Sequence, residues 1–385
     1  MDALPRLGLV REPTALFHAP RLSAAMGGPQ LLFKRDDLLP VAFGGNKVRS
    51  LDLIVAEALR HGADTLVTGA GPLSNHVRAS AGVAALTGLR CLAIYWGSPP
   101  QRIEGNQLLA RMLGAEIRFT NDFDRTSVDR GIEAATAEIA ARGGHPCSIP
   151  RGGACAIAAL AHVLAVRENL GQCKAFGVVP QAVVMPAGGA ATLAGWLLGS
   201  ALFGANWRIE AVAVSRPAKE TFVRAQSLAA AAAAEIGCPR GLDGVEVFVH
   251  DGFLGAGYGI PSAEGQNAIA VTARAEGVLL DPTYTGKPRT FSCNSISCNS
   301  SRARSRPARP LLGLFERSFS MRRSAASTRS RARSRSNRVY RRGSDSIRFF
   351  RDDARSPNGR RMSLRPTPVD FFAITGSICE PGLFC

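Results

Sequence analysis

Lysine is absent between Pro288 and Cys385, although this stretch contains 21 arginines and 6 acidic residues. It therefore carries a net charge of +15, out of +17 for the whole chain of 385 residues. Residues 1–287 hold 26 basic and 24 acidic side chains, a net charge of +2. A nearly neutral body excludes a protein that is basic throughout. A hydrophobic content of 46% excludes a chain that is disordered over its whole length.

Cysteine pairs of the C-x-x-C type are absent from residues 1–287, and scattered single cysteines are typical of reduced thiols in the cytoplasm. The N-terminus lacks the apolar core of a signal peptide. One uncharged run, residues 175–207, is long enough to span a membrane, but prolines and glycines near its middle would break a spanning helix. We expect a buried strand, a glycine turn and an apolar helix there.

From Arg49 onward, strand patterns alternate with helix patterns. Apolar residues at helical spacing predict a helix over residues 51–59 that ends before Gly62. Further helices are expected from residue 77 and over residues 105–113. Strands are expected at residues 65–68, 91–96, 116–119, 182–185, 209–214 and 245–249. This alternation predicts an α/β fold with two units of parallel sheet, each covered by helices on both faces.

A loop with two glycines precedes Lys47 and allows a close backbone approach to a ligand. If Lys47 is partly buried at the start of the following helix, its ammonium form is disfavoured. The neutral amine is then available to form a Schiff base. The alternative is a lysine in a solvent-exposed loop.

Residues 69–76 form a second candidate loop, between a strand and a helix. Open α/β sheets bind ligands at such positions, and amides at the helix start can receive a carboxylate or a phosphate. Asn75 could donate a hydrogen bond to a phenolate oxygen. The alternative is that Ser74 or Asn75 only caps the helix and that His76 has a structural role.

A turn of small residues precedes another expected helix and could cradle an anion with its amides and a threonine hydroxyl. It matches neither the dinucleotide fingerprint nor the phosphate-binding loop of nucleotide hydrolases, and close helix–strand packing is the alternative. Its candidate residues are Gly188, Gly189, Ala190, Ala191 and Thr192.

Two of only four tyrosines, Tyr258 and Tyr284, lie in glycine-containing loops. Each is either a buried aromatic side chain or a phenol placed over a ligand.

Together and in this order, these motifs resemble the family of D-cysteine desulfhydrases and 1-aminocyclopropane-1-carboxylate deaminases. The resemblance spans residues 4–287. It implies a pyridoxal 5'-phosphate enzyme with the fold of the tryptophan synthase β chain, a two-domain open parallel-sheet fold (fold type II). The resemblance rests on motifs at residues 34–38, 44–47, 74–76, 105–106, 113–115, 149–153 and 281–287.

The implied organisation is a large cofactor-binding domain from residues 1–48 plus 160–287, and a small α/β domain from residues 49–159. Residues 288–385 form a low-complexity, Arg/Ser-rich tail. The resemblance also implies a final core region with a His-Thr-Gly-Gly loop after Lys287. The tail follows instead, and residues 372–377 and 381–384 echo that ending much later in the chain.

The resemblance assigns a role to each candidate. Lys47 would bind the cofactor covalently and later move the Cα proton of the substrate. Asn75 would donate a hydrogen bond to the ring oxygen of the cofactor. Ser74, Asn75 and His76 would lie beside the substrate carboxylate, and Ser74 is also a candidate catalytic residue. The cofactor phosphate would be bound by Gly188, Gly189, Ala190, Ala191 and Thr192. Thr285 and Thr375 would contact other parts of the cofactor. Tyr258 and Tyr284 would face the substrate as catalytic residues.

The implied reaction is β-elimination from a small amino acid, with D-cysteine giving pyruvate, hydrogen sulfide and ammonia. The alternatives are an L-cysteate sulfo-lyase and a 1-aminocyclopropane-1-carboxylate deaminase. Ring-opening deaminases carry a glutamate at the position of Thr285, so the hydroxyl here favours simple β-elimination. The resemblance also implies a homodimer. The scattered cysteines indicate the cytoplasm, and the interrupted apolar run indicates no membrane association.

The tail has three interpretations. Such sequence cannot bury enough apolar area to offset its ordering entropy, so it is expected to be disordered. An arginine-rich arm could bind nucleic acid, which we expect only through this tail. Translation in a shifted reading frame is the interpretation that we favour over an arm. An inactive relic or a basic-tailed binding protein is therefore the alternative to an active enzyme.

Overall fold

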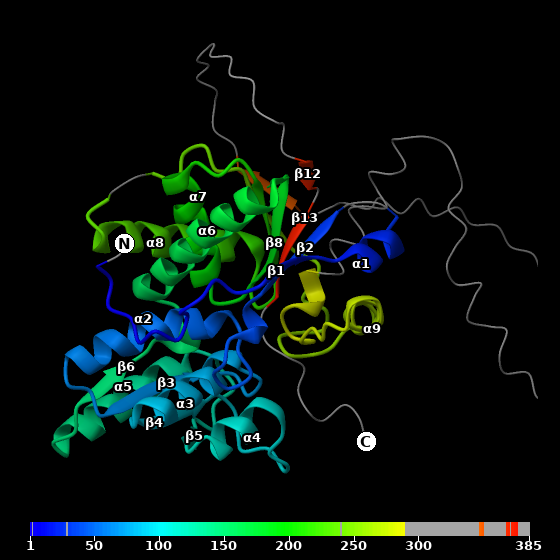
Figure 1. The fold of residues 1–385 in the computed structure, drawn as a ribbon. Coiled ribbons are helices and arrows are strands. Elements are labelled where there is room, and N and C mark those ends of the chain that lie inside the picture. Colours follow the sequence, from blue (N-terminus) through cyan, green and yellow to red (C-terminus); the bar gives the residue numbers. More distant parts are fainter. Residues whose placement is uncertain are drawn as a thin grey trace, which may run out of the picture.

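The computed structural model describes residues 1, 3–27, 30–238 and 241–288, together with the backbone of strands at 346–349, 367–369 and 371–375. Two larger sheets lie in different halves of this part of the chain, each packed with helices (Figure 1). We call them the small sheet and the large sheet.

The small sheet has four parallel strands in the order β5-β4-β3-β6. Its side chains alternate between two apolar clusters, as the pleat of a strand requires. Leu66 faces the cluster built with α2 and α3, whereas Val67 faces the cluster built with α5. The strands are β3 (Thr65–Ala70), β4 (Arg90–Tyr95), β5 (Glu116–Phe119) and β6 (Pro146–Ser148). The helices around them are α2 (Asn46–Arg60), α3 (Asn75–Thr87), α4 (Gly105–Met112), α5 (Ser127–Ala141) and the 3-10 turn η2 (Arg151–Gly153).

The large sheet has the order β1-β2-β13-β8-β9-β10-β11. Its central strands are parallel, and the outer pairs, β1 with β2 and β10 with β11, are antiparallel. The strands are β1 (Leu16–His18), β2 (Leu31–Arg35), β8 (Ala182–Ala187), β9 (Arg208–Ala213), β10 (Val247–His250), β11 (Ser346–Phe349) and β13 (Phe371–Thr375). A separate parallel pair joins β7 (Val178–Pro180) to β12 (Thr367–Val369).

Helices cover both faces of the large sheet. A broad apolar core that includes Trp196 lies between the sheet and α6, α7 and α8. A smaller cluster with Leu22 and Phe33 lies on the other face, beside α1 and α9 (Figure 1). These helices are α1 (Pro20–Ala25), α6 (Ala156–Phe176), α7 (Ala191–Phe203), α8 (Ala218–Glu235) and α9 (Ala263–Glu276), and the 3-10 turn η1 spans Asp36–Leu38.

The alternating strands and helices predicted from the sequence are confirmed, with ends that differ by a few residues. The run 175–207 forms strands, a turn and the buried helix α7, as expected. Among the described residues, Arg151–Phe176 is long and apolar enough to cross a membrane, but 61% of its most apolar window is buried inside the protein. The strands of the small sheet all fall within residues 49–159; the exact domain boundaries stay a prediction.

Three short strands belong to the expected tail, and the rest of residues 289–385, where disorder was expected, lies outside the described residues. The most consequential of them is β13, which lies parallel between β2 and β8 in the middle of the large sheet. The segment that echoes the family ending therefore fills the position between these two strands.

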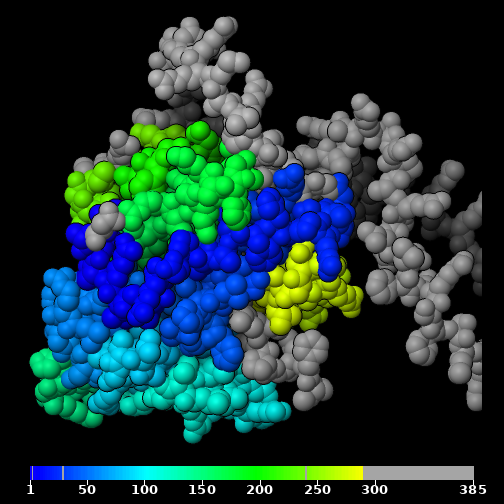
Figure 2. Space-filling model, viewed as in Figure 1, coloured from blue at the N-terminus to red at the C-terminus, as the bar shows by residue number. Residues whose placement is uncertain are grey.

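The N-terminal residues cross the surface between the two halves, where they are the blue band in Figure 2. The backbone amide of Leu7 donates to the Asp52 carbonyl of α2 at 3.1 Å, and the Leu9 amide donates to the Asp52 carboxylate at 2.8 Å. This segment is thereby attached to the helix that carries Lys47.

A buried ion cluster joins α2 to the large half. Arg49 donates to both carboxylate oxygens of Asp36 at 2.8 and 2.9 Å, and to Glu168 of α6 at 2.8 Å. Lys34 of β2 also donates to Glu168. Because buried charges are tolerated only when they are paired and hydrogen-bonded, this geometry fixes the first turn of α2.

Replacing Arg49 with Met should lower the free energy of unfolding by about 3–5 kcal/mol, because Asp36 and Glu168 would stay buried without their partner. Urea unfolding followed by circular dichroism measures the change. The control is Arg60→Met in the same helix, where the pair with Glu57 is exposed and little change is expected. Equal effects of the two substitutions would contradict the assigned importance of the cluster.

Candidate active site

A pocket lies where parallel strands of both sheets end. Its lining includes Ala70 at the end of β3, Trp96 after β4, Ala187 at the end of β8 and Ser215 after β9. Ligands bind beyond the carboxyl ends of strands in open α/β sheets. The structure brings ten of the predicted residues to this pocket: Lys47, Ser74, Asn75, His76, Gly188, Gly189, Ala190, Thr192, Tyr258 and Tyr284.

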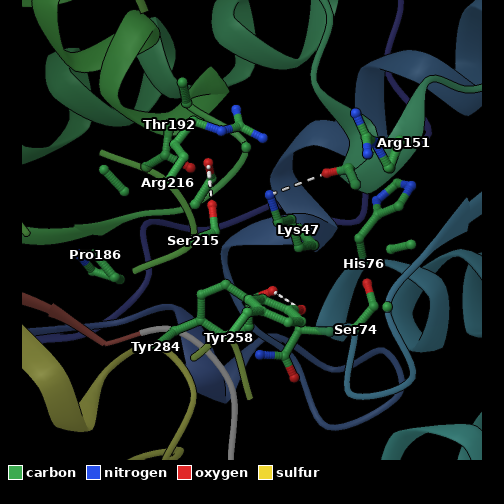
Figure 3. A pocket seen from close by; sticks show the side chains of 18 of the residues that line it. Lys47, Ser74, His76, Arg151, Pro186, Thr192, Ser215, Arg216, Tyr258 and Tyr284 are labelled. Atoms are coloured by element: carbon green, nitrogen blue, oxygen red, sulfur yellow. Dashed lines mark hydrogen bonds between the residues drawn. The ribbon is translucent and has the colours of Figure 1, made fainter. Parts of the chain in front are cut away.

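Lys47 is the second residue of α2, and it points into the pocket rather than into open solvent (Figure 3). Its Nζ lies 3.4 Å from the carbonyl oxygen of Gly152. Burial lowers the pKa of Lys47 to about 8, although Cys155 acts in the opposite direction. A larger fraction of this amine is therefore neutral near neutral pH than for an ordinary lysine, and the neutral amine is the nucleophilic form.

Asn75 is held at both ends of its side-chain amide. Its Nδ2 donates to Asp281 at 3.3 Å, and its Oδ1 accepts from Asn106 at 3.0 Å. Burial raises the pKa of Asp281 to about 7, while hydrogen bonds from backbone amides and from Asn75 counteract this rise. With its orientation fixed in this way, Asn75 can offer its second Nδ2 hydrogen to an oxygen in the pocket.

Ser74 and His76 begin α3. The Ser74 side chain accepts from the amide of Val77 at 3.3 Å, so it caps the helix as well as lining the pocket. His76 Nε2 lies 2.9 Å from the Thr68 hydroxyl. Burial, and to a lesser degree the charge of Lys47, lowers the pKa of His76 to about 3, so this imidazole is neutral at ordinary pH. In Figure 3 both side chains lie on one side of Lys47.

The turn before α7 has the geometry of an anion cradle. Ala190 adopts a left-handed backbone with φ of +73°, which costs a residue with a side chain about 1 kcal/mol or more. A Cβ at Gly188 would lie 3.1 Å from the Tyr284 ring, which leaves little room for a side chain. The amides that start α7 point their positive dipole end toward this turn.

Thr192 is oriented by two polar side chains beneath the cradle. Its hydroxyl accepts from Asn46 Nδ2 at 3.0 Å and lies 3.2 Å from Nε2 of the buried His162. Sequence reasoning missed His162, because an isolated histidine in an apolar helix pattern gives no local signal.

Tyr258 and Tyr284 lie together across the pocket from Lys47, and a dashed line joins their hydroxyls in Figure 3. The two oxygens are 2.6 Å apart. Burial, followed by the neighbouring Tyr258, raises the pKa of Tyr284 well above its ordinary value. Tyr284 therefore keeps its proton. Within the pair, the hydroxyl that accepts the hydrogen bond has its own hydrogen free.

Three predicted cofactor contacts are not brought to the pocket lining among the described residues. Ala191 is buried at the start of α7. Thr285 is buried and accepts from the backbone amide of Asp281 at 2.8 Å. Thr375 ends β13, and continuing the register by two residues brings its backbone opposite Pro186, which lines the pocket; its side chain lies outside the described part of the chain.

Four arginines that the sequence analysis missed also line the pocket: Arg125, Arg151, Arg216 and Arg224. Arg216 lies in the loop that follows β9, and a charged residue shortly after a parallel strand is a signal that could have found it. Arg125 lies in a loop that approaches the site only through the tertiary fold.

A family model described as "Pyridoxal-phosphate dependent enzyme" matches residues 8–289. The D-cysteine desulfhydrases of Salmonella choleraesuis (strain SC-B67) and Salmonella typhi are 38% and 37% identical to this chain over 302 residues. Each match covers 77% of this chain and 90% of the relative.

Among solved structures, one described as an ACC deaminase homologue matches with a TM-score of 0.71 and 29% identity, covering 77% of this chain and 89% of the other. A fungal L-serine ammonia-lyase from Rhizomucor miehei matches with a TM-score of 0.53 and 17% identity, covering 75% and 88%, and this likeness concerns the fold alone.

The residues present fit pyridoxal phosphate. The buried amine of Lys47 suits its aldehyde, and the strained turn at Ala190 with the start of α7 suits its phosphate. The fixed amide of Asn75 suits its ring oxygen.

The lowered pKa of Lys47 predicts how the cofactor loads. Because only the neutral amine attacks the aldehyde, the loading rate of cofactor-free protein should rise with pH and level off above about pH 8. Stopped-flow absorbance measures this rate. A rate that keeps rising toward pH 10, as for an ordinary lysine, would contradict the buried environment described here.

Proposed function

Because the chain belongs to the family of pyridoxal-phosphate-dependent enzymes, we propose that it catalyses β-elimination from D-cysteine to give pyruvate, hydrogen sulfide and ammonia. The similarity to D-cysteine desulfhydrases supports this substrate. The observation that carries the proposal is that Lys47 and the Tyr258–Tyr284 pair line one pocket, so a base and a proton donor face the same space.

The cofactor, when bound, supplies an electron sink for the carbanion formed at the Cα of the substrate. Lys47 Nζ accepts the Cα proton. Ser74 and the amides at the start of α3 bind the substrate carboxylate. The free phenol hydrogen of the Tyr258–Tyr284 pair is donated to the departing sulfur, which leaves with the electron pair of the Cβ–S bond.

Thr285 bears on the choice between elimination and cyclopropane opening. Its hydroxyl oxygen accepts from the Asp281 amide, so a neutral group, rather than a carboxylate, stands at this position. A carboxylate would hold a pyridine nitrogen protonated and deepen the electron sink, whereas a hydroxyl would not. This supports β-elimination over the deaminase alternative. The deaminase activity is the second candidate function because the chain resembles the structure of an ACC deaminase homologue.

Loss of the covalent cofactor link tests the function directly. After incubation with pyridoxal phosphate and borohydride reduction, peptide mapping should find the pyridoxyl adduct on Lys47. Lys47→Ala should abolish the adduct and lower D-cysteine turnover about a thousandfold, because base and attachment point are lost together. The control is Lys219→Ala, on the exposed surface of α8. An adduct on another lysine, or none, would refute the proposal.

We also propose a homodimer in the cytoplasm. The described cysteines are unpaired, which supports a reducing compartment. The exposed Leu38 and Leu86 line one apolar groove, which supports a contact between two copies of this chain.

Light scattering should give twice the monomer mass for the wild type and the monomer mass for Leu86→Glu, because a charge would be buried in the contact. Leu108→Glu, an exposed leucine of α4 outside the groove, should leave the dimer intact. A wild-type monomer would overturn the proposal.

A further inference from the structure

The loop that leads into α2 has an unusual backbone. Its last four residues all have positive φ angles, which are 46°, 62°, 63° and 103° at Ala42, Phe43, Gly44 and Gly45. Glycine adopts this left-handed region freely, whereas a side chain there collides with its own backbone. Ala42 and Phe43 are therefore held in a conformation that costs free energy. Lys47 follows the loop by two residues, so this strain lies directly before the candidate cofactor lysine.

The loop is enclosed from two sides. A Cβ at Gly44 would lie 2.3 Å from the Asp37 carbonyl oxygen in η1, which leaves no room for a side chain. On the other side, a Cβ at Gly82 of α3 would lie 2.5 Å from the Cβ of Ala42. Helix α3 therefore packs directly against the loop, and a change on this face of the helix is transmitted to it.

Arg78 lies about one turn before Gly82 in α3 and binds the same loop through its guanidinium. This buried side chain donates from Nη1 to the Ala42 carbonyl, and its Nη2 donates to the Gly44 carbonyl at 3.4 Å. The guanidinium is a rigid plane with several donors, so one side chain fixes two carbonyls of the strained loop at once.

Arg78 also contacts a residue expected at the cofactor ring. Its Nη2 donates to Oδ1 of Asn75 at 3.4 Å, and Asn106 donates to the same oxygen at 3.0 Å. With Oδ1 occupied in this way, the amide cannot turn over without losing both bonds. Two buried arginines thus bracket the start of α2: Arg78 holds the loop before Lys47, and Arg49 holds the turn that contains it.

We propose that Arg78 is a positioning residue: it holds loop 42–45 in the left-handed conformation that brings Lys47 Nζ into the pocket, and it keeps the Asn75 amide turned toward the cofactor ring. Arg78 lies outside the pocket lining, so it acts only through these two residues. The inference rests on the function proposed above, in which Lys47 carries the cofactor, and it adds a residue that the sequence motifs do not single out.

Loss of the guanidinium would release the loop. The carbonyls of Ala42 and Gly44 would then bind water, the backbone of Ala42 and Phe43 would leave the left-handed region, and the start of α2 would shift. Water would reach Lys47 Nζ as a result. Because burial is the main cause of its lowered pKa, the pKa of Lys47 would rise from about 8 toward the ordinary 10.5.

Other titratable groups near Lys47 do not obscure this change. His76 of α3 and His162 of α6 stay neutral, because burial lowers the pKa of both. Burial raises the pKa of Cys155 at the start of α6, so its thiol is neutral near neutral pH. Asp281 has a pKa of about 7 and titrates in every variant alike. The arginines of the lining keep their charge throughout, and all these groups are retained in the variants compared.

The test measures how fast cofactor-free, full-length protein binds pyridoxal phosphate across pH, by stopped-flow absorbance. Arg78→Met should lower the plateau rate at least about tenfold and move the midpoint of the profile upward by about one pH unit. Arg78→Lys keeps a cation with three donors and should recover part of the loss. The control is Arg111→Met, at an exposed arginine of α4, which should load like the wild type.

Rescue separates positioning from a loss of stability. Adding Phe43→Gly to Arg78→Met should raise the plateau rate at least about threefold and return the midpoint toward its wild-type value, because glycine adopts a positive φ without collision. The Phe43 ring is 55% exposed, so its removal costs little packing. Phe43→Gly alone should load like the wild type, because Arg78 still holds the loop.

A second pair of variants reaches the loop without touching Arg78. Gly82→Ala adds a methyl group against Ala42, so it should displace the loop and slow loading at least about threefold. Alanine favours a helix more than glycine does, so α3 itself is retained. Adding Ala42→Gly removes the collision and should restore the wild-type rate.

Wild-type loading by Arg78→Met, or by Gly82→Ala where Arg78→Met does not fold, would overturn the proposal. A slower rate with an unmoved midpoint, or with no recovery on adding Phe43→Gly, would overturn it as well, since Arg78 would then only stabilise the fold. If the wild type attaches no cofactor at Lys47, the proposed function itself fails, and the positioning role fails with it.

Discussion

The pairing of Arg49 with Asp36 and Glu168 is the constraint on which the site depends. Asp36 follows strand β2, Glu168 belongs to α6, and Arg49 stands two residues after Lys47. The fork of the guanidinium fits both carboxylates, so a shift of α2 along its axis would separate several charges at once. The buried ion cluster therefore sets the position of the Lys47 amine in the pocket.

The pocket separates neutral groups from charged ones. Some lining groups are kept uncharged by burial, such as the His76 imidazole and the Tyr284 phenol. Other lining groups are half-buried guanidinium groups, which keep their charge. Proton transfer is thereby confined to the amine and the phenol pair, while the arginines provide electrostatic attraction without exchanging protons.

Much of this site follows from the sequence, because its residues lie in short segments with local signals. Lys47 follows a glycine turn, and Ser74 caps the helix that its own neighbours predict. What the sequence could not reveal depends on contacts between distant segments. Asn75 and Asp281 are 206 residues apart, and Arg125 reaches Ser215 across 90 residues. The position of β13 could not be predicted from the sequence either, because a local pattern does not determine which strands pair with each other.

The place of β13 has a consequence for how the molecule is made. On the ribosome, the chain emerges from its N-terminus, so β2 and β8 are available long before residues 371–375 are synthesised. Until then both strands carry open hydrogen-bonding edges in what will become the centre of the sheet. Closure of that gap joins segments more than 300 residues apart, a pairing of high contact order that is slow to form. Until β13 is synthesised, the nascent chain therefore exposes unpaired backbone groups at this position, and pairing of β13 completes the centre of the sheet.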